Sequence, residues 1–458
     1  MTDLVEKLVK AVGPENVLTG TFVHDDYAHD EALTSIPALP LALVRPGSTA
    51  EVADVLRVAD DERIPVVARG SGTGLSGAAV PRPDGILVSF ERMNRILEID
   101  TENHVAVVQP GVTLEELDVA TAGHGLVYPV FPGENSASLG GNVATNAGGM
   151  RAIKYGVTRH QVLALQAVLA TGEVIRTGGK FVKASTGYDL TQIIVGSEGT
   201  LALVTEATVK LHPRAAEAVT VLVPFASLDQ VTSAVPRIVA SGAAPLILEY
   251  IDALTMAAIT ANVGLDLGVP APVQQEAAAY LVVVLENARL DRLEQDVAEL
   301  GELLVGLGAM EVYVLPAPAA GQLISAREKA FFVAKAAGAD DIIDVVVPRS
   351  AIPAFLATAL EVAAAHGTLV TGCGHVGDGN VHLSVFQPDA ERRAEVLRAV
   401  FRAGMDLGGA ISGEHGVGTA KKRYFHELED PTKVALMQRI KDAFDPHGIL
   451  GPGVLFDR

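Results

Sequence analysis

Two histidines, His375 and His382, lie on either side of an Asp-Gly pair within residues 373–386, where the other positions favour extended structure. An Asp-Gly pair between such segments favours a two-residue hairpin turn. With Asp378 and Gly379 in the turn, we expect His375 directly opposite His382, their β-carbons about 5 Å apart. Two imidazoles at that separation could bind one metal ion, so the hairpin is a candidate metal site. The alternative is two unliganded histidines on a solvated face.

The same turn predicts the register of the whole hairpin. Cys373 is expected opposite Ser384, and Thr371 opposite Phe386. Because side chains alternate along a strand, Val381 and the residues at 383 and 385 should point to the other face. The hairpin would then carry the candidate site on one surface only.

A second pair of ionisable residues, Glu414 and His415, follows in the glycine-rich stretch 412–418. His375, His382 and Glu414 form a set of two imidazoles and one carboxylate, which suits Zn²⁺, Mn²⁺ or Fe²⁺ and leaves coordination positions open. His415 is then the candidate general base, because an imidazole with a pKa of about 6.5 can accept a proton at neutral pH. Asn380, beside the turn, either hydrogen-bonds a ligand or holds the turn.

The composition restricts the functions open to such a site. The chain of 458 residues suggests two or three domains, and 49% hydrophobic with 20% charged residues indicates a globular protein. A formal net charge of −20 argues against nucleic-acid binding. The single cysteine, Cys373, excludes an internal disulfide and fits a reducing compartment.

We also expect no transmembrane segment, because no apolar run approaches the roughly 20 residues that a bilayer requires. The first residues lack the pattern of a signal peptide. The expected location is the cytoplasm, with peripheral attachment to the inner membrane left open.

The N-terminal elements must position a glycine-rich loop. Residues 41–45 and 64–69 are predicted strands, and a capping box at Ser48 begins a helix between them that runs to about Glu62. This strand–helix–strand order indicates a mixed structure of helices and strands.

Residues 70–77 follow with the spacing G-x-G-x-x-G. A dinucleotide-binding fold would need a helix after this motif, but Pro81 and Pro83 exclude one, so residues 85–90 should return as a strand. Such a loop can still bind phosphate through converging main-chain N–H groups, with Arg69 nearby. The alternative is a flexible surface turn. Hydroxyl groups in this loop belong to Ser71, Thr73 and Ser76.

Two further glycine-rich stretches, residues 132–149 and 195–200, lack bulky side chains. A long loop of this kind lets the main chain approach a flat ligand closely. Asn142 and Thr145 add an amide and a hydroxyl group. Three such loops in one half of the chain indicate a single large nucleotide cofactor held mainly by main-chain atoms.

These motifs resemble those of a known family. The sequence resembles the flavin domain of the vanillyl-alcohol oxidase superfamily at residues 65–81, 132–149 and 196–200. Nearly the whole chain is similar to the FAD-linked D-2-hydroxyacid dehydrogenases, with further matches at 375–382, 412–418 and 445–450. This family includes the glycolate oxidase flavin subunit, D-lactate dehydrogenase and D-2-hydroxyglutarate dehydrogenase.

The resemblance implies an α+β fold, with a two-subdomain FAD-binding domain of the vanillyl-alcohol oxidase type and a ferredoxin-like α+β cap domain with an antiparallel sheet. The expected domains are 1–213 for FAD binding, 214–408 for the substrate or cap domain, and 409–458 for a C-terminal helical segment that returns to the FAD domain. Two strand–helix–strand repeats, over 219–251 and 280–315, suggest an open sheet with helices on one side.

FAD is the cofactor that the resemblance implies, held by the three glycine-rich loops. Because residues 69–77 contain no histidine for a covalent link, we expect it to bind non-covalently. The residues expected to bind FAD are Arg69, Gly70, Ser71, Gly72, Thr73, Gly74, Ser76, Gly77, Pro132, Ser138, Gly141, Asn142, Thr145, Gly148, Gly149, Glu198, Gly199 and Val204.

A helix over residues 319–337 carries the candidate substrate-binding groups. The resemblance gives Arg327 the role of binding the substrate carboxylate, which suits a guanidinium group, and Lys335 that of a second basic group. The implied reaction oxidises a D-2-hydroxyacid to a 2-oxoacid by hydride transfer to flavin N5, with a divalent metal easing deprotonation of the hydroxyl. Glycolate, D-lactate and D-2-hydroxyglutarate all stay open as substrates.

Two other functions stay open. A transferase like alkyl-dihydroxyacetonephosphate synthase would use FAD without net oxidation, although the adjacent histidines of those enzymes are missing here. A non-catalytic flavoprotein subunit of a glycolate oxidase complex would bind FAD without turnover. The electron acceptor is expected to be a partner protein or a quinone, and the chain is expected to form a homodimer or hetero-oligomer.

Overall fold

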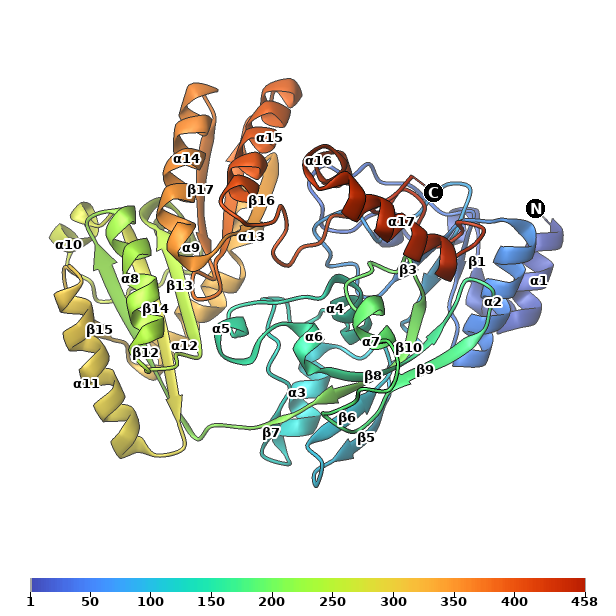
Figure 1. The fold of residues 1–458 in the computed structure, drawn as a ribbon, viewed down its shortest axis with the longest axis horizontal. Helices are drawn as coiled ribbons and strands as arrows, with labels where there is room; N and C mark the ends of the chain where they lie inside the picture. Colours follow the sequence, from blue (N-terminus) through green and yellow to red (C-terminus); the bar gives the residue numbers. More distant parts are fainter. Residues whose placement is uncertain (1, 458) are drawn as a thin grey trace.

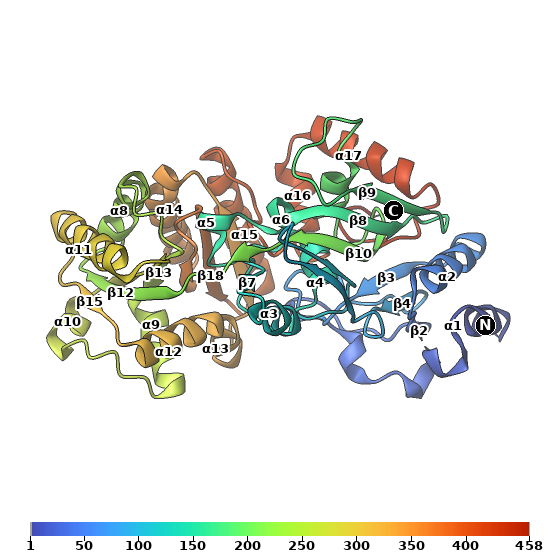
Figure 2. The same cartoon turned by 90° about the horizontal axis from the view of Figure 1, so that it is seen from below.

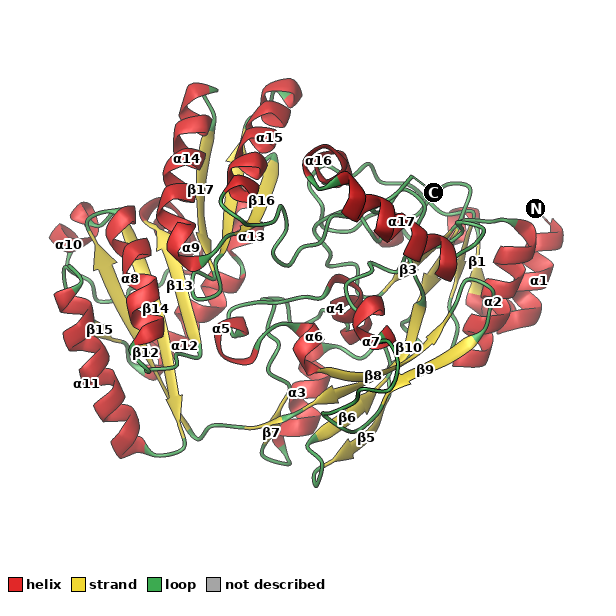
Figure 3. Ribbon diagram, in the orientation of Figure 1, coloured by secondary structure: helices red, strands yellow, loops and turns green. Residues whose placement is uncertain are grey.

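The computed structural model describes residues 2–457, which form two lobes (Figure 1). The first lobe, blue to green in Figure 1, contains two main sheets, and the second, yellow to orange, is built on one larger sheet. The last helices, in dark red, return to the first lobe. Both lobes mix helices with strands, as the secondary-structure colours in Figure 3 show.

A small four-stranded sheet begins the first lobe. Its strands are β1 Val17–Leu18, β2 Ala42–Val44, β3 Val66–Arg69 and β4 Ile86–Ser89, with helices α1 Thr2–Val12 and α2 Thr49–Glu62 packed against them. The order is β1-β2-β4-β3, with β2, β4 and β3 parallel. The Ser48 hydroxyl accepts a hydrogen bond from Glu51 N at 3.2 Å, which confirms the predicted start of α2.

A five-stranded antiparallel sheet completes the first lobe, in the order β5-β6-β10-β8-β9. Its strands are β5 Ile96–Asp100, β6 Val105–Val108, β8 Val162–Val168, β9 Val174–Gly178 and β10 Leu203–Lys210. The remaining elements are α3 Leu114–Ala122, β7 Leu126–Val127, α4 Leu139–Thr145, α5 Ala152–Tyr155, α6 Thr158–Gln161, α7 Leu190–Ile194 and β11 His212–Pro213.

Helix α4 lies inside the stretch 132–149 that we expected to be a loop. The Ser138 hydroxyl caps it by accepting from Gly141 N at 3.3 Å, and Asn146 ends it with a φ of +55°. Glycines at 140 and 141 do not prevent this short helix, because it is capped at both ends. The expectation of a continuous loop was therefore wrong.

The second lobe contains a seven-stranded antiparallel sheet in the order β15-β12-β14-β13-β17-β18-β16. Its strands are β12 Glu217–Phe225, β13 Ile247–Asp252, β14 Ala279–Asn287, β15 Tyr313–Val314, β16 Asp341–Val346, β17 Leu369–Gly374 and β18 Asn380–Phe386. Its helices are α8 Leu228–Ala240, α9 Ala253–Val263, α10 Ala271–Glu276, α11 Leu290–Gly306, α12 Ala317–Glu328, α13 Ala330–Ala336, α14 Ile352–Ala365 and α15 Ala390–Asp406.

Helices cover both faces of this sheet, not one face as the sequence suggested (Figure 2). Helices α8, α11, α14 and α15 pack on the face that carries Val221 and Val223. Helices α9, α12 and α13 pack on the opposite face, against Leu222 and Ile251. The strands are therefore apolar on both sides, which is typical of a doubly covered sheet. The helix predicted over 319–337 is divided into α12 and α13 at Lys329.

The hairpin forms, but its register differs from the prediction. Cys373 lies opposite His382 and Thr371 opposite Ser384, a shift of two residues along one strand. Because the shift is an even number, every side chain keeps its predicted face.

The connection between β17 and β18 spans residues 375–379 instead of two residues. Asn380 N donates to His375 O at 3.2 Å and closes this wider loop. Gly379 has a φ of +96°, and a β-carbon there would lie 2.1 Å from Val347 O. The Asp-Gly pair thus serves the close approach of the loop to the end of β16, which a local turn pattern could not reveal.

The C-terminal helices α16 Lys422–Leu428 and α17 Pro431–Phe444 lead back to the first sheet. Val66 N donates to Ile449 O at 2.7 Å, and Gly451 N donates to Val66 O at 2.8 Å, so the chain end lies along the free edge of β3. Within residues 2–457, no helix is both long and apolar enough to span a bilayer.

Candidate active site

The three glycine-rich segments meet at one pocket in the first lobe, which we call the loop pocket. Every predicted cofactor-binding residue lines it except Gly77 and Gly149. A β-carbon at Gly77 would lie 2.3 Å from Thr419 Oγ1, and one at Gly149 would lie 1.8 Å from Phe131 O. These two glycines therefore permit close contacts within the protein instead of facing the pocket.

The first loop offers main-chain donors to the loop pocket. Among the described residues, the N–H groups of Gly72, Thr73 and Gly74 have no protein acceptor. Asn142 Nδ2 is buried without a partner in residues 2–457. Because buried donors are seldom left unpaired, this amide indicates a polar ligand, and the partly buried N–H groups of the first loop suit a phosphate.

Two predicted cofactor residues use their charges within the protein. Arg69 Nη1 and Nη2 donate to His29 O at 2.6 Å and Asp26 O at 2.7 Å, which fixes the first loop to the preceding segment. Glu198 accepts from the main-chain N–H groups at 417 and 418, at 3.0 and 2.8 Å, and joins the loop pocket to the C-terminal loop. Both side chains line the pocket but have their polar atoms occupied by main-chain groups.

The predicted metal set comes together in the second lobe. His375 Nε2 lies 3.1 Å and His382 Nε2 lies 3.3 Å from Glu414 Oε1, and all three side chains are buried or nearly so. The two imidazole rings are 4.9 Å apart between centroids, at 81° to each other. Although the register was wrong, His375 turns back from the loop and still meets His382.

Glu249 on β13 holds both His375 and Arg327. Its carboxylate lies 2.6 Å from His375 Nδ1 and 2.7 Å from Arg327 Nη2, and it is fully buried. Burial lowers the pKa of His375, but Glu249 and Glu414 outweigh it and raise that pKa well above the ordinary value. Glu249 therefore orients one imidazole and one guanidinium at once, as carboxylates behind metal-ligating histidines do.

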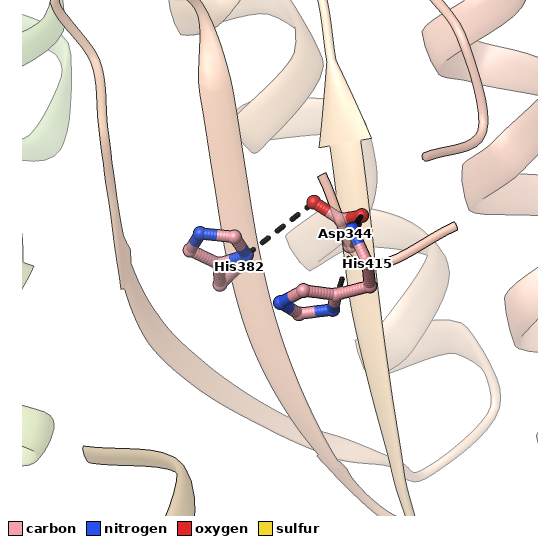
Figure 4. A group of neighbouring side chains, drawn as sticks. All are labelled: Asp344, His382 and His415. Atoms are coloured by element: carbon pink, nitrogen blue, oxygen red, sulfur yellow. Dashed lines mark hydrogen bonds and ion pairs between the residues drawn. The ribbon is translucent and has the colours of Figure 1, made fainter. Parts of the chain in front are cut away.

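Asp344 on β16 lies beside His382 and His415 (Figure 4), and it holds the loop that carries Glu414 and His415. Its Oδ2 accepts from the main-chain N–H groups of residues 413, 414 and 415 at 3.0, 3.1 and 2.9 Å, and from Ser412 Oγ at 2.7 Å. Burial alone would raise the pKa of this carboxyl, but the nearby His415, Lys421 and His382 hold it well below its usual range. The ionised carboxylate of Asp344 therefore fixes the loop that carries Glu414 and His415.

His415 stacks on His382, with ring centroids 5.0 Å apart and planes 12° apart. Its Nδ1 lies 3.8 Å from Asp344 Oδ2 and has no hydrogen-bond partner among the described residues. Burial lowers the pKa of His415 to about 4. The imidazole is therefore neutral at physiological pH, and it is a weaker base than the imidazole with a pKa of about 6.5 that the sequence led us to expect.

The side chains of His375, His382, Glu414 and His415 form one group, which we call the cluster. A second pocket, the cap pocket, lies between the cluster and helices α9 and α13. It is lined by His375, His382 and Arg327, whereas Glu414 and His415 line both this pocket and the loop pocket. Ligands in the two pockets would therefore meet at these two residues.

Two predicted catalytic residues lie elsewhere. Lys335 is half exposed and pairs with Glu31 at 2.6 Å, so the structure does not bring it to the cluster. Asn380 Nδ2 donates to Asp344 Oδ1 at 2.9 Å and to Val345 O at 3.1 Å, which corresponds to a role in holding the loop instead of contacting a ligand.

Sequence reasoning missed Glu249 and Asp344. Each is a buried carboxylate inside a mostly apolar strand, β13 or β16, whose only other acidic residue lies at one end of that strand. An unpaired buried carboxylate is costly, so this pattern was a signal that each had a partner, although it could not identify that partner.

Comparisons with known proteins agree with this geometry. Residues 214–455 match the family model of FAD linked oxidases, C-terminal domain, and residues 40–178 match that of a FAD binding domain. An uncharacterized FAD-linked oxidoreductase of Mycobacterium tuberculosis is 58% identical over 456 residues, covering 100% of this chain and 99% of that protein. A D-lactate dehydrogenase of Anaerostipes hadrus is 36% identical, covering 98% and 96%.

The solved structure of 4-ethylphenol oxidase from Gulosibacter chungangensis has a TM-score of 0.80 at 19% identity and covers 99% of this chain and 97% of that chain. This likeness confirms the expected fold class, a flavin-binding fold of the vanillyl-alcohol oxidase type with an antiparallel cap sheet. The free donors of the loop pocket fit the FAD that the family model implies. The chain therefore belongs to the FAD-linked oxidases and is an FAD-linked oxidoreductase.

Proposed function

We propose that this protein oxidises a D-2-hydroxyacid to the corresponding 2-oxoacid, with non-covalent FAD in the loop pocket and a divalent metal held by His375, His382 and Glu414. The observation that carries the proposal is that Glu414 and His415 line both pockets. Relatives named D-lactate dehydrogenase, glycolate oxidase subunit GlcD and D-2-hydroxyglutarate dehydrogenase, similar over nearly the whole chain, support the substrate class.

The donor set fits a divalent ion. Ligand atoms about 2.0–2.2 Å from a zinc-like ion, at tetrahedral to octahedral angles, lie roughly 3.0–3.5 Å from one another. The separations of 3.1 and 3.3 Å between the imidazole nitrogens and Glu414 Oε1 fall in this range. Zn²⁺, Mn²⁺ and Fe²⁺ all accept these ligands. When bound, such an ion supplies a Lewis acid for the substrate hydroxyl.

Residues of the chain would then supply the substrate-binding group and the general base. Arg327 lies in the cap pocket with its Nε buried and without a partner among the described residues, and it would bind the substrate carboxylate. His415, held neutral by burial, would accept the hydroxyl proton. FAD, when bound, supplies the hydride acceptor. Because residues of both lobes line the two pockets, the site would be partly shielded from water.

We further propose that the electrons leave to an acceptor protein or a quinone, and that the chain works as a homodimer or within a hetero-oligomer in the cytoplasm, with or without peripheral contact with the inner membrane. The name of the GlcD relative, a glycolate oxidase subunit, supports an assembly.

Anaerobic mixing of the FAD-loaded protein with D- and L-2-hydroxyacids tests the proposal. We expect D-acids to bleach the visible flavin absorbance, L-acids to leave it unchanged, and a chelator to abolish bleaching until a divalent metal is returned. A protein that binds FAD but is bleached by no 2-hydroxyacid would contradict the proposal and favour a transferase or a non-catalytic subunit.

A further inference from the structure

The cap pocket extends well beyond the cluster along the hairpin. Three cross-strand pairs form its floor: Cys373 with His382, Thr371 with Ser384, and Leu369 with Phe386. Since an antiparallel strand rises about 3.4 Å per residue, the row from residue 382 to residue 386 is about 13 Å long. The pocket is thus a groove, with the cluster at one end and the half-exposed Leu369 at the other.

The roof of this groove is apolar and includes several alanines among larger side chains. Helix α9 contributes Ala258 and Ile259, and helix α13 contributes Ala330, Val333 and Ala334. Alanines on both helices leave space between roof and floor that larger side chains would fill. The hydroxyl of Thr371 is already hydrogen-bonded to Asp252 at 2.8 Å, so the middle of the floor offers few free polar groups.

The groove also lacks a cation for a second carboxylate. Among the described residues that line it, Arg327 is the one permanent cation, and Glu249 already pairs with it. Lys335 points instead to Glu31. Glu328 adds a carboxyl group near Arg327. An anionic group at the distal end of a substrate would be desolvated without a partner, at a high cost.

We infer that this groove binds the side chain of the substrate, and that the substrate is a 2-hydroxyacid with an apolar chain of several carbons, not a dicarboxylate such as 2-hydroxyglutarate. The inference rests on the proposed function, since it places the carboxylate and hydroxyl of the acid at Arg327 and the histidine cluster. The chain then extends over the Thr371–Ser384 pair toward Phe386.

Steady-state kinetics of the FAD- and metal-loaded enzyme with D-lactate, D-2-hydroxyhexanoate and D-2-hydroxyglutarate test the inference. Each buried methylene should raise kcat/KM about fourfold, so the hexanoate should exceed lactate by roughly 60-fold over three methylenes. Hydroxyglutarate should fall at least about 100-fold below the hexanoate, because its charge would be buried unpaired. Calorimetric titration with 2-oxohexanoate and 2-oxoglutarate should show the same order of affinity.

Ala334→Phe should fill the groove and reduce the preference for hexanoate over lactate at least about tenfold. Ala336→Phe, on the exposed side of the same helix, is the matched control and should keep the preference. If Ala334→Phe does not fold, Ala258→Phe on helix α9 provides the same test from the other side of the roof.

The outcomes separate the two proposals. Highest activity with hydroxyglutarate, or no gain from lactate to hexanoate, would overturn the inference and leave the proposed function supported. Absence of flavin reduction by all three acids, in a protein that binds FAD and metal, would overturn the proposed function itself.

Discussion

Replacing Asp344 by asparagine should loosen the loop that carries Glu414 and His415. The carboxylate is fully buried and accepts four hydrogen bonds at Oδ2 and one at Oδ1. Hydrogen bonds to a charged group contribute about 1.5–3 kcal/mol each, and neutral ones about 1 kcal/mol. The amide would also point its NH₂ group at Asn380 Nδ2, and Lys421 would lose an ion pair at 3.6 Å.

The neutral amide is easier to bury than the carboxylate, which offsets part of this loss. We therefore expect the free energy of unfolding to fall by about 3–5 kcal/mol, the usual cost of breaking a buried ion pair. Urea unfolding of the FAD-loaded protein measures it. Asp341→Asn, on the same strand, is the matched control, because its carboxylate makes a 3.8 Å contact with Arg393 and accepts one hydrogen bond, from the adjacent Ile342 N at 2.9 Å. That variant should lose less than about 1 kcal/mol.

The pH dependence gives a second check on Asp344. The folded-state pKa of Asp344 is depressed. The contribution of its carboxylate to the free energy of unfolding is therefore fully present above the unfolded-state pKa of about 3.9 and is lost as pH falls further. The stability gap between wild type and Asp344→Asn should be constant from about pH 5 to 8 and should narrow only in stronger acid. Metal affinity should fall about 10–100-fold, as for other residues that orient metal ligands. An unchanged stability at neutral pH would refute the role of Asp344 as an anchor.

Three other variants test separate parts of the structure. His382→Ala should lose the metal and most turnover but retain FAD, as metal analysis and flavin absorbance will show; full activity would remove the metal from the proposal. Arg327→Lys should raise the substrate Kd in anaerobic flavin titrations about 10–100-fold, because an ammonium group cannot bind a carboxylate bidentately; an unchanged Kd would exclude the carboxylate contact. Lys441→Met should cost about 3–5 kcal/mol in urea unfolding, since it leaves Asp445 buried without its cation; a loss below about 1 kcal/mol would show that the pair is dispensable.

Local patterns predicted the elements of this protein well. The capped helix after Ser48 and the strand–helix–strand repeats of the cap lie where the sequence placed them, and the glycine-rich segments of the first lobe meet at one pocket although one of them contains helix α4. His375 and His382 also meet, because both belong to one hairpin and the even shift in register leaves His382 on its predicted face. The helix, the repeats and the hairpin each depend on residues close together in sequence, whereas Glu414 is held near the histidines by the distant Asp344.

The failures concern contacts between distant segments. The Asp-Gly pair did not form a two-residue turn, because Gly379 approaches Val347, which directly follows strand β16. Arg69 lines the loop pocket as predicted, but its guanidinium group also contacts main-chain carbonyls 40 and 43 residues earlier. Lys335 is a basic residue on the helix that was predicted to bind the substrate, but its side chain pairs with Glu31 in the other lobe. No local pattern contains these partners.

The charges of the site also depend on such distant contacts. Three buried carboxylates, Glu249, Asp344 and Glu414, face two permanent cations, Arg327 and Lys421. The raised pKa of His375 makes this imidazole a third cation while no metal is bound, so the set then carries no net charge. A divalent ion would replace the proton of His375, change the sum to one net positive charge and make the site attractive to an anion. The substrate carboxylate should therefore bind more tightly to the metal-loaded site, so substrate affinity and metal occupancy should rise and fall together.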